Sequence, residues 1–288
     1  MNEEKLNNLE IDPVFVIREA FLGYKFRKKE HKLYDSDQEI PTNLIKLYYG
    51  LLDKRVQFDS LKRAFVQHYI HEESKIEGID AKEIHSKVEV RGLEAMYEYI
   101  HSPEIDYMFN VYTLKELHEK LFSFADHPEC AGFIRNDNVY LPGTGMELCD
   151  WRDIRNELNK LDKDVIRLYE VASKIDPYSD INGILKFIDE CVELKCKLIK
   201  VHPFFDGNGR VIRGLINKLF ETAGLPPIYI KDNERTEYHK AMNLANCEGN
   251  YASIKQFYKY KICDSIVELD INERIKINNS NEKSKTRK

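Results

Sequence analysis

The sequence has few of the cysteines that cross-link small extracellular folds through disulfides or metal ions. Its 288 residues include only six cysteines, scattered without a Cys-x-x-Cys pair and without a histidine at zinc-ligand spacing. A disulfide framework is not expected in a chain so long and so poor in cysteine, and we interpret the thiols as buried or half-buried. They are Cys130, Cys149, Cys191, Cys196, Cys247 and Cys263.

Long apolar runs and an excess of positive charge are also lacking. No stretch approaches the roughly 20 apolar residues that cross a bilayer. The net charge of −5 gives no reason to expect nucleic acid as a partner. The N-terminus, MNEEKLNNLE, is acidic and lacks the basic start and apolar run of a signal peptide. We therefore expect a cytoplasmic protein that binds neither membranes nor nucleic acid.

What the chain does have is helical periodicity, with 42% apolar residues to build a core. Thr113, with Glu116 three residues later, has the spacing of a capping box. One short strand is predicted at 138–141, closed by Pro-Gly-Thr-Gly at 142–145, which together indicate a small β-hairpin. The sequence therefore predicts an all-α protein with one hairpin. Apolar residues three and four apart predict helices over 58–77, 81–101, 113–121, 151–161, 184–199 and 251–267.

The segment His202–Arg210 is the part of the chain with the most specific composition. Pro203 disfavours helical geometry at the residue before it, so the preceding helix should end near Val201. Apolar residues then recur every four positions, which predicts a second helix from about Arg210, with Gly224 as its C-terminal cap. The segment is therefore a short loop between two buried helices.

Several features of this loop favour anion binding. Gly207 and Gly209 permit positive φ, and Asn208 tolerates it, so consecutive N–H groups can form an anion-binding nest. The new helix adds free N–H groups and the positive end of its dipole. Arg210 and Arg213 lie in its first turn, where cations are unfavourable unless an anion is nearby.

The remaining residues of the loop suit phosphoryl chemistry. Asp206 offers a carboxylate for Mg²⁺, with phosphates supplying further ligands. His202, with a pKa near neutrality, is a candidate base for an attacking hydroxyl. Phe204 is expected to point into the core and pin the loop. Taken singly, each residue fits an ordinary tight turn between helices; taken together and in this order, they favour a phosphate site.

The run His202–Arg213, HPFFDGNGRVIR, resembles the signature of the Fic (fido-domain) family, HPF-x-(D/E)-GNGR-x-x-R. The resemblance extends over residues 111–267. It implies an all-α, Fic-type helical bundle with a β-hairpin flap, and AMP transfer from Mg·ATP to a Ser, Thr or Tyr hydroxyl of a protein. Residues 1–110 would then form an N-terminal helical extension packed on the catalytic domain. Residues 268–288 are polar and expected to be disordered.

The resemblance also implies roles for single residues. His202 would take the proton of the target hydroxyl and Asp206 would coordinate Mg²⁺. Arg210 would stabilise the leaving pyrophosphate, and Arg213 would bind the γ-phosphate. The phosphates would further be held by Gly207, Asn208 and Gly209. Around the adenine the family often has Arg-x-x-Tyr-Tyr and then Asn, which correspond here to Arg235, Tyr238, His239 in place of the second Tyr, and Asn246.

An inhibitory segment is suggested by a second, weaker resemblance. Many Fic proteins carry Ser/Thr-x-x-x-Glu-Gly/Asn, whose glutamate pairs with the second signature arginine. Residues 73–78, near the end of the helix predicted at about 58–78, are Glu-Ser-Lys-Ile-Glu-Gly, so Glu77 would face Arg213. Glu73 stands in the Ser/Thr position, which leaves the strength of inhibition open. The alternative is an ordinary charge at a helix end capped by Gly78. In some relatives the same glutamate positions water and reverses the modification.

The flap is the expected docking element for the protein target. Val139, Tyr140 and Leu141 would offer an edge to which an extended target segment adds through main-chain hydrogen bonds. The target is not identified by the sequence, self-modification is possible, and a homodimer stays an open question. Two alternatives remain: transfer of UMP, phosphocholine or phosphate by the same loop, and a non-catalytic interaction module.

Overall fold

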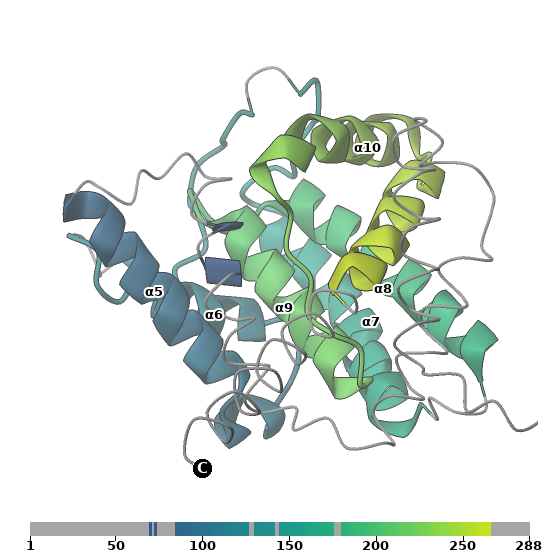
Figure 1. The fold of residues 1–288 in the computed structure, drawn as a ribbon. Helices are drawn as coiled ribbons and strands as arrows, with labels where there is room; N and C mark the ends of the chain where they lie inside the picture. The colour runs from purple at the N-terminus through teal and green to yellow at the C-terminus, as the bar shows by residue number, and fades with distance from the viewer. Residues whose placement is uncertain are drawn as a thin grey trace, which may run out of the picture.

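The structure is a computed structural model that describes residues 69, 70, 72, 73, 84–126, 130–141, 144–175 and 180–265. Every regular element in these residues is a helix, which confirms the predicted fold class (Figure 1). Residues 252–265 are helical as well. The elements are α5 (Ile84–Ile100), the 3₁₀ turn η1 (Pro103–Asp106), α6 (Thr113–Leu121), α7 (Ile154–Lys174), α8 (Ile181–Val201), α9 (Asn208–Thr222), η3 (Asp232–Glu234) and α10 (Arg235–Glu248).

Helix α9 is the central helix of the bundle. It contacts α5, α6, α7 and α8, and residues 210–220 are all buried. A helix surrounded on all sides must bury its polar residues as well, so these need partners. Asn217 meets this need, because its amide bonds the Tyr97 hydroxyl and both main-chain polar groups of Ile228.

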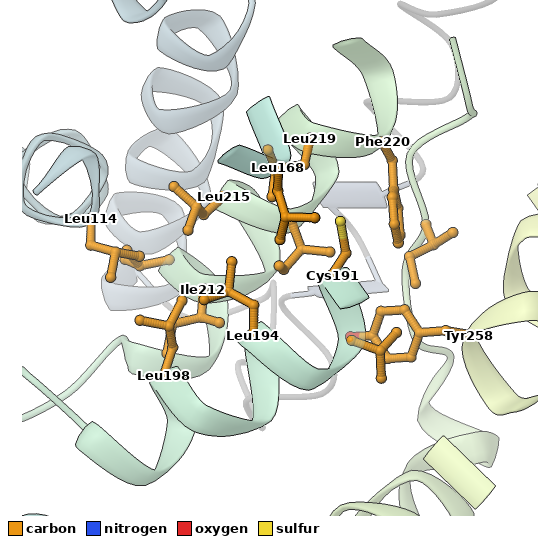
Figure 2. Close-up of a cluster of buried hydrophobic side chains, with 14 of the residues drawn as sticks. Leu114, Leu168, Cys191, Leu194, Leu198, Ile212, Leu215, Leu219, Phe220 and Tyr258 are labelled. Atoms are coloured by element: carbon orange, nitrogen blue, oxygen red, sulfur yellow. The ribbon is translucent and has the colours of Figure 1, made fainter. Parts of the chain in front are cut away.

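The core fills the space between α9 and its neighbours. Figure 2 shows Leu114 of α6, Leu168 of α7 and Leu194 of α8 converging on Ile212 and Leu215 of α9. All five side chains are at most 2% exposed. Burial of this kind contributes about 1.5–3 kcal/mol for each large aliphatic side chain, which fixes α8 and α9 against each other. The loop between these two helices is held by their packing.

The ends of α8 and α9 lie where the sequence predicts. Helix α8 ends at Val201, and α9 begins at Asn208, two residues before the predicted start. Gly224 follows α9 with φ +75°, its N–H donates to the carbonyl of Glu221, and the N–H of Leu225 donates to that of Phe220. These two bonds are a Schellman motif, which satisfies the last carbonyls of α9.

The N-terminal portion is more closely joined to the bundle than the predicted boundary at residue 110 suggests. Helix α5 packs on α6 and α9. At Gly92 a Cβ would lie 1.9 Å from the main-chain oxygen of Leu121, so only glycine allows α5 to cross α6 this closely. At Gly214 of α9 the nearest side chains are those of Met96 and Ile100 of α5.

Three local predictions need correction. Thr113 is not an N-cap: the cap is Tyr112, and the Thr113 hydroxyl accepts from the N–H of Asn110. The predicted hairpin is not found, since residues 138–141 and 144–150 form no strand. Residues 142 and 143 lie outside the described part of the chain. The six cysteines are free, but Cys130 and Cys247 are exposed and not buried. In the part of the chain that the structure describes, no helix is long and apolar enough to span a membrane.

Candidate functional site

The signature loop is shaped by two left-handed residues. His202 closes α8 with φ 49° and ψ 65°, and it is the one non-glycine residue with positive φ among the described residues. Gly207 opens α9 with φ +73°, and a Cβ there would lie 2.6 Å from the ring of Phe122. Glycine is therefore required at 207 for both its conformation and its space, as predicted. Gly209, by contrast, lies within α9 and has no positive φ.

The ring of His202 is arranged to accept a proton. Its Nδ1 lies 3.3 Å from the carbonyl oxygen of Ile199, which can only accept, so Nδ1 carries the hydrogen. The other nitrogen, Nε2, then presents its lone pair. Burial lowers the pKa of His202 below its ordinary value, and the Arg135 cation lowers it further. The imidazole is therefore neutral at pH 7 and can serve as a base.

Asn208 shapes the loop through its side chain. Its Oδ1 accepts from the N–H of Phe204 at 2.9 Å, and its Nδ2 donates to the carbonyl of Phe204 at 2.7 Å. Both polar atoms of the side chain are thus engaged within the loop, so a phosphate contact by Asn208 would be made by its main-chain N–H. Phe204 itself is 1% exposed and points into the core, as predicted.

The N-terminus of α9 leaves donors free for an anion. The first intrahelical bond runs from the N–H of Val211 to the carbonyl of Gly207 at 3.0 Å. The N–H groups of Asn208, Gly209 and Arg210 precede it and have no intrahelical acceptor. They lie at the positive end of a 15-residue helix, which is the geometry of an anion site.

Both signature arginines are held by carboxylates from the N-terminal portion. Arg213 is 6% exposed, and its Nε lies 2.8 and 2.9 Å from the two carboxylate oxygens of Glu73, while its Nη2 also donates to Glu73. Arg210 donates to Glu89 of α5 at 3.0 Å and to Asp206 at 3.2 Å. The cationic groups expected to bind phosphate are thus neutralised by neighbouring acids.

Arg213 has a carboxylate partner that was not predicted for this role. Glu77 lies outside the residues that the structure describes, so its placement stays a prediction. The carboxylate found on Arg213 is that of Glu73, the residue standing where the inhibitory motif has Ser or Thr. Glu73 is fully buried, and a fork-shaped contact between guanidinium and carboxylate is the strong form of this pair.

Asp206 fits the requirements of a single-carboxylate cation site. Its side chain is 73% exposed at the mouth of the loop, with one oxygen on the N–H of Gly207 and the other on Arg210. Within the described residues no cluster of three or more His, Cys, Asp or Glu side chains could hold a metal by itself. A divalent cation bound here would need oxygens from phosphates and water, which is the usual arrangement for Mg²⁺.

The residues expected around a nucleotide base lie on α10. Tyr238 is buried, and its hydroxyl accepts from Lys195 at 2.6 Å. His239 is exposed beside it. Asn246 is 8% exposed and its Nδ2 has no hydrogen-bond partner. His239 and Asn246 are seven residues apart, so they share a face of α10. Tyr238 therefore supports the helix, while the amide nitrogen of Asn246 remains available to a ligand.

The flap, residues 137–151, passes beside α10. The residues predicted to dock the target are partly or well exposed, with Tyr140 at 77%; they are Val139, Tyr140 and Leu141. The Cys247 thiol, next to Asn246, lies 3.7 Å from the carbonyl of Thr144. The structure therefore places the flap near the end of α10 that carries Asn246.

Two residues that hold the loop were not predicted. The Nδ1 of His118 on α6 accepts from the N–H of Gly132, and its Nε2 donates to the carbonyl of Asp206 at 3.2 Å. Its ring stacks on Phe204 with centroids 3.9 Å apart. Arg135 is buried and donates to the carbonyl of His202 at 2.7 Å. Each is a single polar residue in an ordinary helix or loop, so the sequence offers no local signal for either.

Comparisons with known proteins point to one family. Residues 108–220 match the Fic/DOC family. Protein adenylyltransferase Fic of Drosophila willistoni is 28% identical over 185 residues, which cover 62% of this chain and 33% of the relative. The protein of the same name from Nematostella vectensis is 26% identical over 255 residues, covering 82% of this chain and 54% of the relative. The chain thus spans a third to about half of the length of these relatives.

The fold is shared with a solved structure of that family. The Fic-1 fragment from C. elegans superposes with a TM-score of 0.63 and covers 95% of this chain and 92% of the fragment, at 21% identity. At this identity the likeness shows the fold, so the chemistry has to be argued from the residues of this chain.

Proposed function

The chain carries a Fic/DOC-family domain, and from that premise we propose that it transfers AMP from ATP to a Ser, Thr or Tyr hydroxyl of a protein. The observation that supports this most is the loop at 202–213. This segment brings together a neutral histidine, an exposed carboxylate, free helix N–H groups and two arginines. They lie in the loop between α8 and α9 and in the first turns of α9. The names of the relatives point to the same reaction.

In the proposed reaction His202 acts as the base. The oxygen of the target hydroxyl forms a bond to the α-phosphorus of ATP, and its proton passes to Nε2 of His202. The bond between the α-phosphorus and the bridging oxygen breaks, and pyrophosphate leaves with the electron pair. The hydrogen bond from Nδ1 to Ile199 keeps the ring oriented while it gains the proton.

The phosphates would be bound by α9. The N–H groups of residues 208–210 and the helix dipole bind the negative charge, and Arg210 neutralises the pyrophosphate as it leaves. Asp206 would hold Mg²⁺, which supplies further positive charge to the phosphate oxygens. Arg210 must first exchange its contacts with Glu89 and Asp206 for contacts with phosphate.

Adenine is the base we propose for the donor. Asn246 has an unpartnered amide nitrogen beneath the flap, and a purine ring nitrogen can accept from it. His239 would offer its ring to the face of the base. Donors of UMP or phosphocholine would place different groups against Asn246, so competition between donors tests this choice.

The N-terminal portion would restrain the reaction through Glu73. With Glu73 on Arg213, the γ-phosphate loses the arginine it would bind, and the buried carboxylate adds a repulsive charge. We assign the inhibitory contact to Glu73, and Glu77 remains a second acid of the same segment. Removal of AMP, with a segment carboxylate positioning water, would be the reverse activity of the same site.

The test compares labelled-ATP transfer by wild type, Glu73→Gln, Glu77→Gln and His202→Ala, each with Mg²⁺ and with a protein extract. The charged hydrogen bond between Arg213 and Glu73 is worth about 1.5–3 kcal/mol. Its loss should raise the affinity for ATP by roughly 10- to 100-fold. We expect Glu73→Gln to raise labelling by about that factor, and His202→Ala to abolish it. The full chain is used throughout.

The controls separate folding from inhibition. In Glu73→Gln, Arg213 loses its contact with the Glu73 carboxylate, so the melting temperature without nucleotide should fall. Saturating ATP should then raise the melting temperature of Glu73→Gln by more than it raises that of wild type. If Glu77→Gln alone raises labelling, the inhibitory contact belongs to Glu77. If no variant labels any protein with ATP, while CDP-choline or UTP donors do, the donor assignment is wrong.

A further inference from the structure

Arg135 is a buried cation without an acidic partner. Its side chain is 2% exposed, and within the described residues it makes no ion pair. Burial lowers the pKa of its guanidinium, which is the expected effect of removing a charge from water. An apolar side chain of similar size would fill the same space at lower cost, so packing alone does not account for an arginine here.

The side-chain hydrogen bonds of Arg135 in the described part of the chain all go to main-chain carbonyls, which lie on two sides of the guanidinium. On one side Nε donates to His202 at 2.7 Å and Nη2 approaches Val201 at 3.5 Å. On the other side Nη1 donates to Asp137 at 2.7 Å and Nη2 to Cys149. One guanidinium therefore joins the end of α8 to both arms of the flap.

The surrounding main chain completes the same junction. The N–H of Arg135 donates to Pro203 at 2.9 Å, and that of Cys149 donates to Lys200 at 3.0 Å. The carbonyls of the last two residues of α8, Lys200 and Val201, are thus satisfied by a flap arm and by Arg135. The negative end of a 21-residue helix also stabilises the cation.

The flap arms meet each other through side chains beside this point. The Oδ1 of Asn138 accepts from the N–H of Trp151 at 2.9 Å, and its Nδ2 donates to Asp150 at 3.3 Å. This cross-link holds the base of the flap without a β-ladder. Arg135 then attaches that base to His202, whose left-handed φ of 49° is held only by such contacts.

We infer that Arg135 is a positioning residue that fixes the flap relative to His202, so that a target segment docked on the flap presents its hydroxyl to the imidazole. The inference rests on the proposed function for its catalytic consequence. The claim that Arg135 attaches the flap to the end of α8 does not depend on the proposed function, because these contacts exist without substrate. The fork of the guanidinium is essential, since a lysine ammonium is a single point that cannot reach carbonyls on both sides.

The experiment uses the full chain and compares Arg135→Lys and Arg135→Gln with wild type. Arg152→Lys is the matched control, because Arg152 lies at the flap base, is exposed and bonds Asp150 without touching α8. Transfer of labelled AMP is measured in the Glu73→Gln background. Affinity for ATP is measured by calorimetry, and circular dichroism checks that each variant is folded.

The chain also contains its own probe of the flap. Trp151 is the single tryptophan and is 39% exposed at the flap base. Release of the flap should change the quenching of its fluorescence by acrylamide. We expect both Arg135 variants to alter quenching and to slow AMP transfer by roughly 10- to 100-fold, with ATP affinity within about twofold of wild type. Arg152→Lys should change neither.

Three outcomes would overturn the inference. Arg135→Lys with wild-type transfer and quenching would show that the charge suffices. Loss of ATP affinity in parallel with transfer would show a general structural role. Unchanged Trp151 quenching in a folded Arg135→Gln would show that the flap is not attached there. If even Glu73→Gln transfers nothing, the proposed function fails, but the quenching comparison still decides whether Arg135 holds the flap.

Discussion

At the scale of single residues, His118 is the clearest case of a group whose ionisation matters for stability. Burial lowers its pKa from 6.5 to about 4. The N–H of Gly132 donates to its Nδ1, and that bond requires an unprotonated nitrogen. Protonated His118 would therefore lose the contact that joins α6 to the segment before Arg135.

The sign of the pH effect follows from this shift. Between pH 6.5 and 4 the unfolded chain binds a proton at His118 that the folded chain does not bind, so the free energy of unfolding falls as the pH falls. From pH 7.5 to pH 5 we expect this one group to remove about 2 kcal/mol. Urea unfolding of wild type and His118→Gln at both pH values measures it.

Comparing how the free energy of unfolding changes with pH in wild type and in His118→Gln separates His118 from the other titrating groups. The wild type should lose about 2 kcal/mol more than His118→Gln between the two pH values. His239→Gln, at an exposed histidine, should behave as wild type. Equal losses in wild type and His118→Gln would show that His118 does not carry this dependence.

The positions of residues were predictable where the residues are contiguous. His202, Asp206 and Gly207 lie in one loop, and the structure places each at the predicted mouth of α9. The partner of Arg213 was not predictable in the same way. Glu73 lies 140 residues away in sequence, and its reach depends on how the N-terminal portion packs.

At the scale of elements, the crossing of α5 and α6 depends on one glycine. A Cβ at Gly92 would lie 1.9 Å from a main-chain oxygen of Leu121, and a backbone cannot yield as a side chain does. We expect Gly92→Ala to lower the free energy of unfolding by about 2 kcal/mol, despite the gain in helix propensity. Chemical denaturation of the full chain measures this difference.

Gly214→Ala is the matched control for that substitution. It is also a helical glycine, but its Cβ would meet the ends of the Met96 and Ile100 side chains at 3.3 and 3.2 Å, and these can shift. Its effect should stay within about 1 kcal/mol. If both variants were equally stable, the close crossing at Gly92 would not be needed.

Periodicity predicted the helices correctly, while turn composition predicted a hairpin that the described residues do not form. Helices α5 and α8 lie where apolar residues repeat every three and four positions. The flap has the turn composition of a hairpin, but the main chain of its arms bonds the end of α8 and Arg135, and the arms are joined to each other through the Asn138 side chain. A short segment cannot reveal that a neighbouring helix end will take its hydrogen bonds.

At the scale of the whole molecule, helix α5 of the N-terminal portion is part of the core. Leu93, Met96, Tyr97 and Ile100 of α5 are at most 1% exposed. Together they would contribute on the order of 6–12 kcal/mol, comparable with the total stability of a domain. A chain starting at residue 111 should therefore lack a cooperative unfolding transition.

Circular dichroism during thermal unfolding and gel filtration, with the full chain as reference, test this expectation. The truncated chain should be aggregated or show a broad, non-cooperative loss of helix. A sharp transition and a monomeric elution would instead support the separate domain predicted for residues 111–267. The outcome also bears on inhibition, because Glu89 reaches Arg210 from the same helix.

The sequence by itself determined the loop between α8 and α9, since turns, caps and helix ends depend on residues within a few positions of one another. Pro203 and Gly207 set the limits of this loop, and Gly224 sets the end of α9, through their own backbone preferences. Tertiary structure alone decided which groups surround the loop. Glu73, Glu89 and Arg135 meet it because helices pack side by side, and their contacts join residues 67 to 140 positions apart.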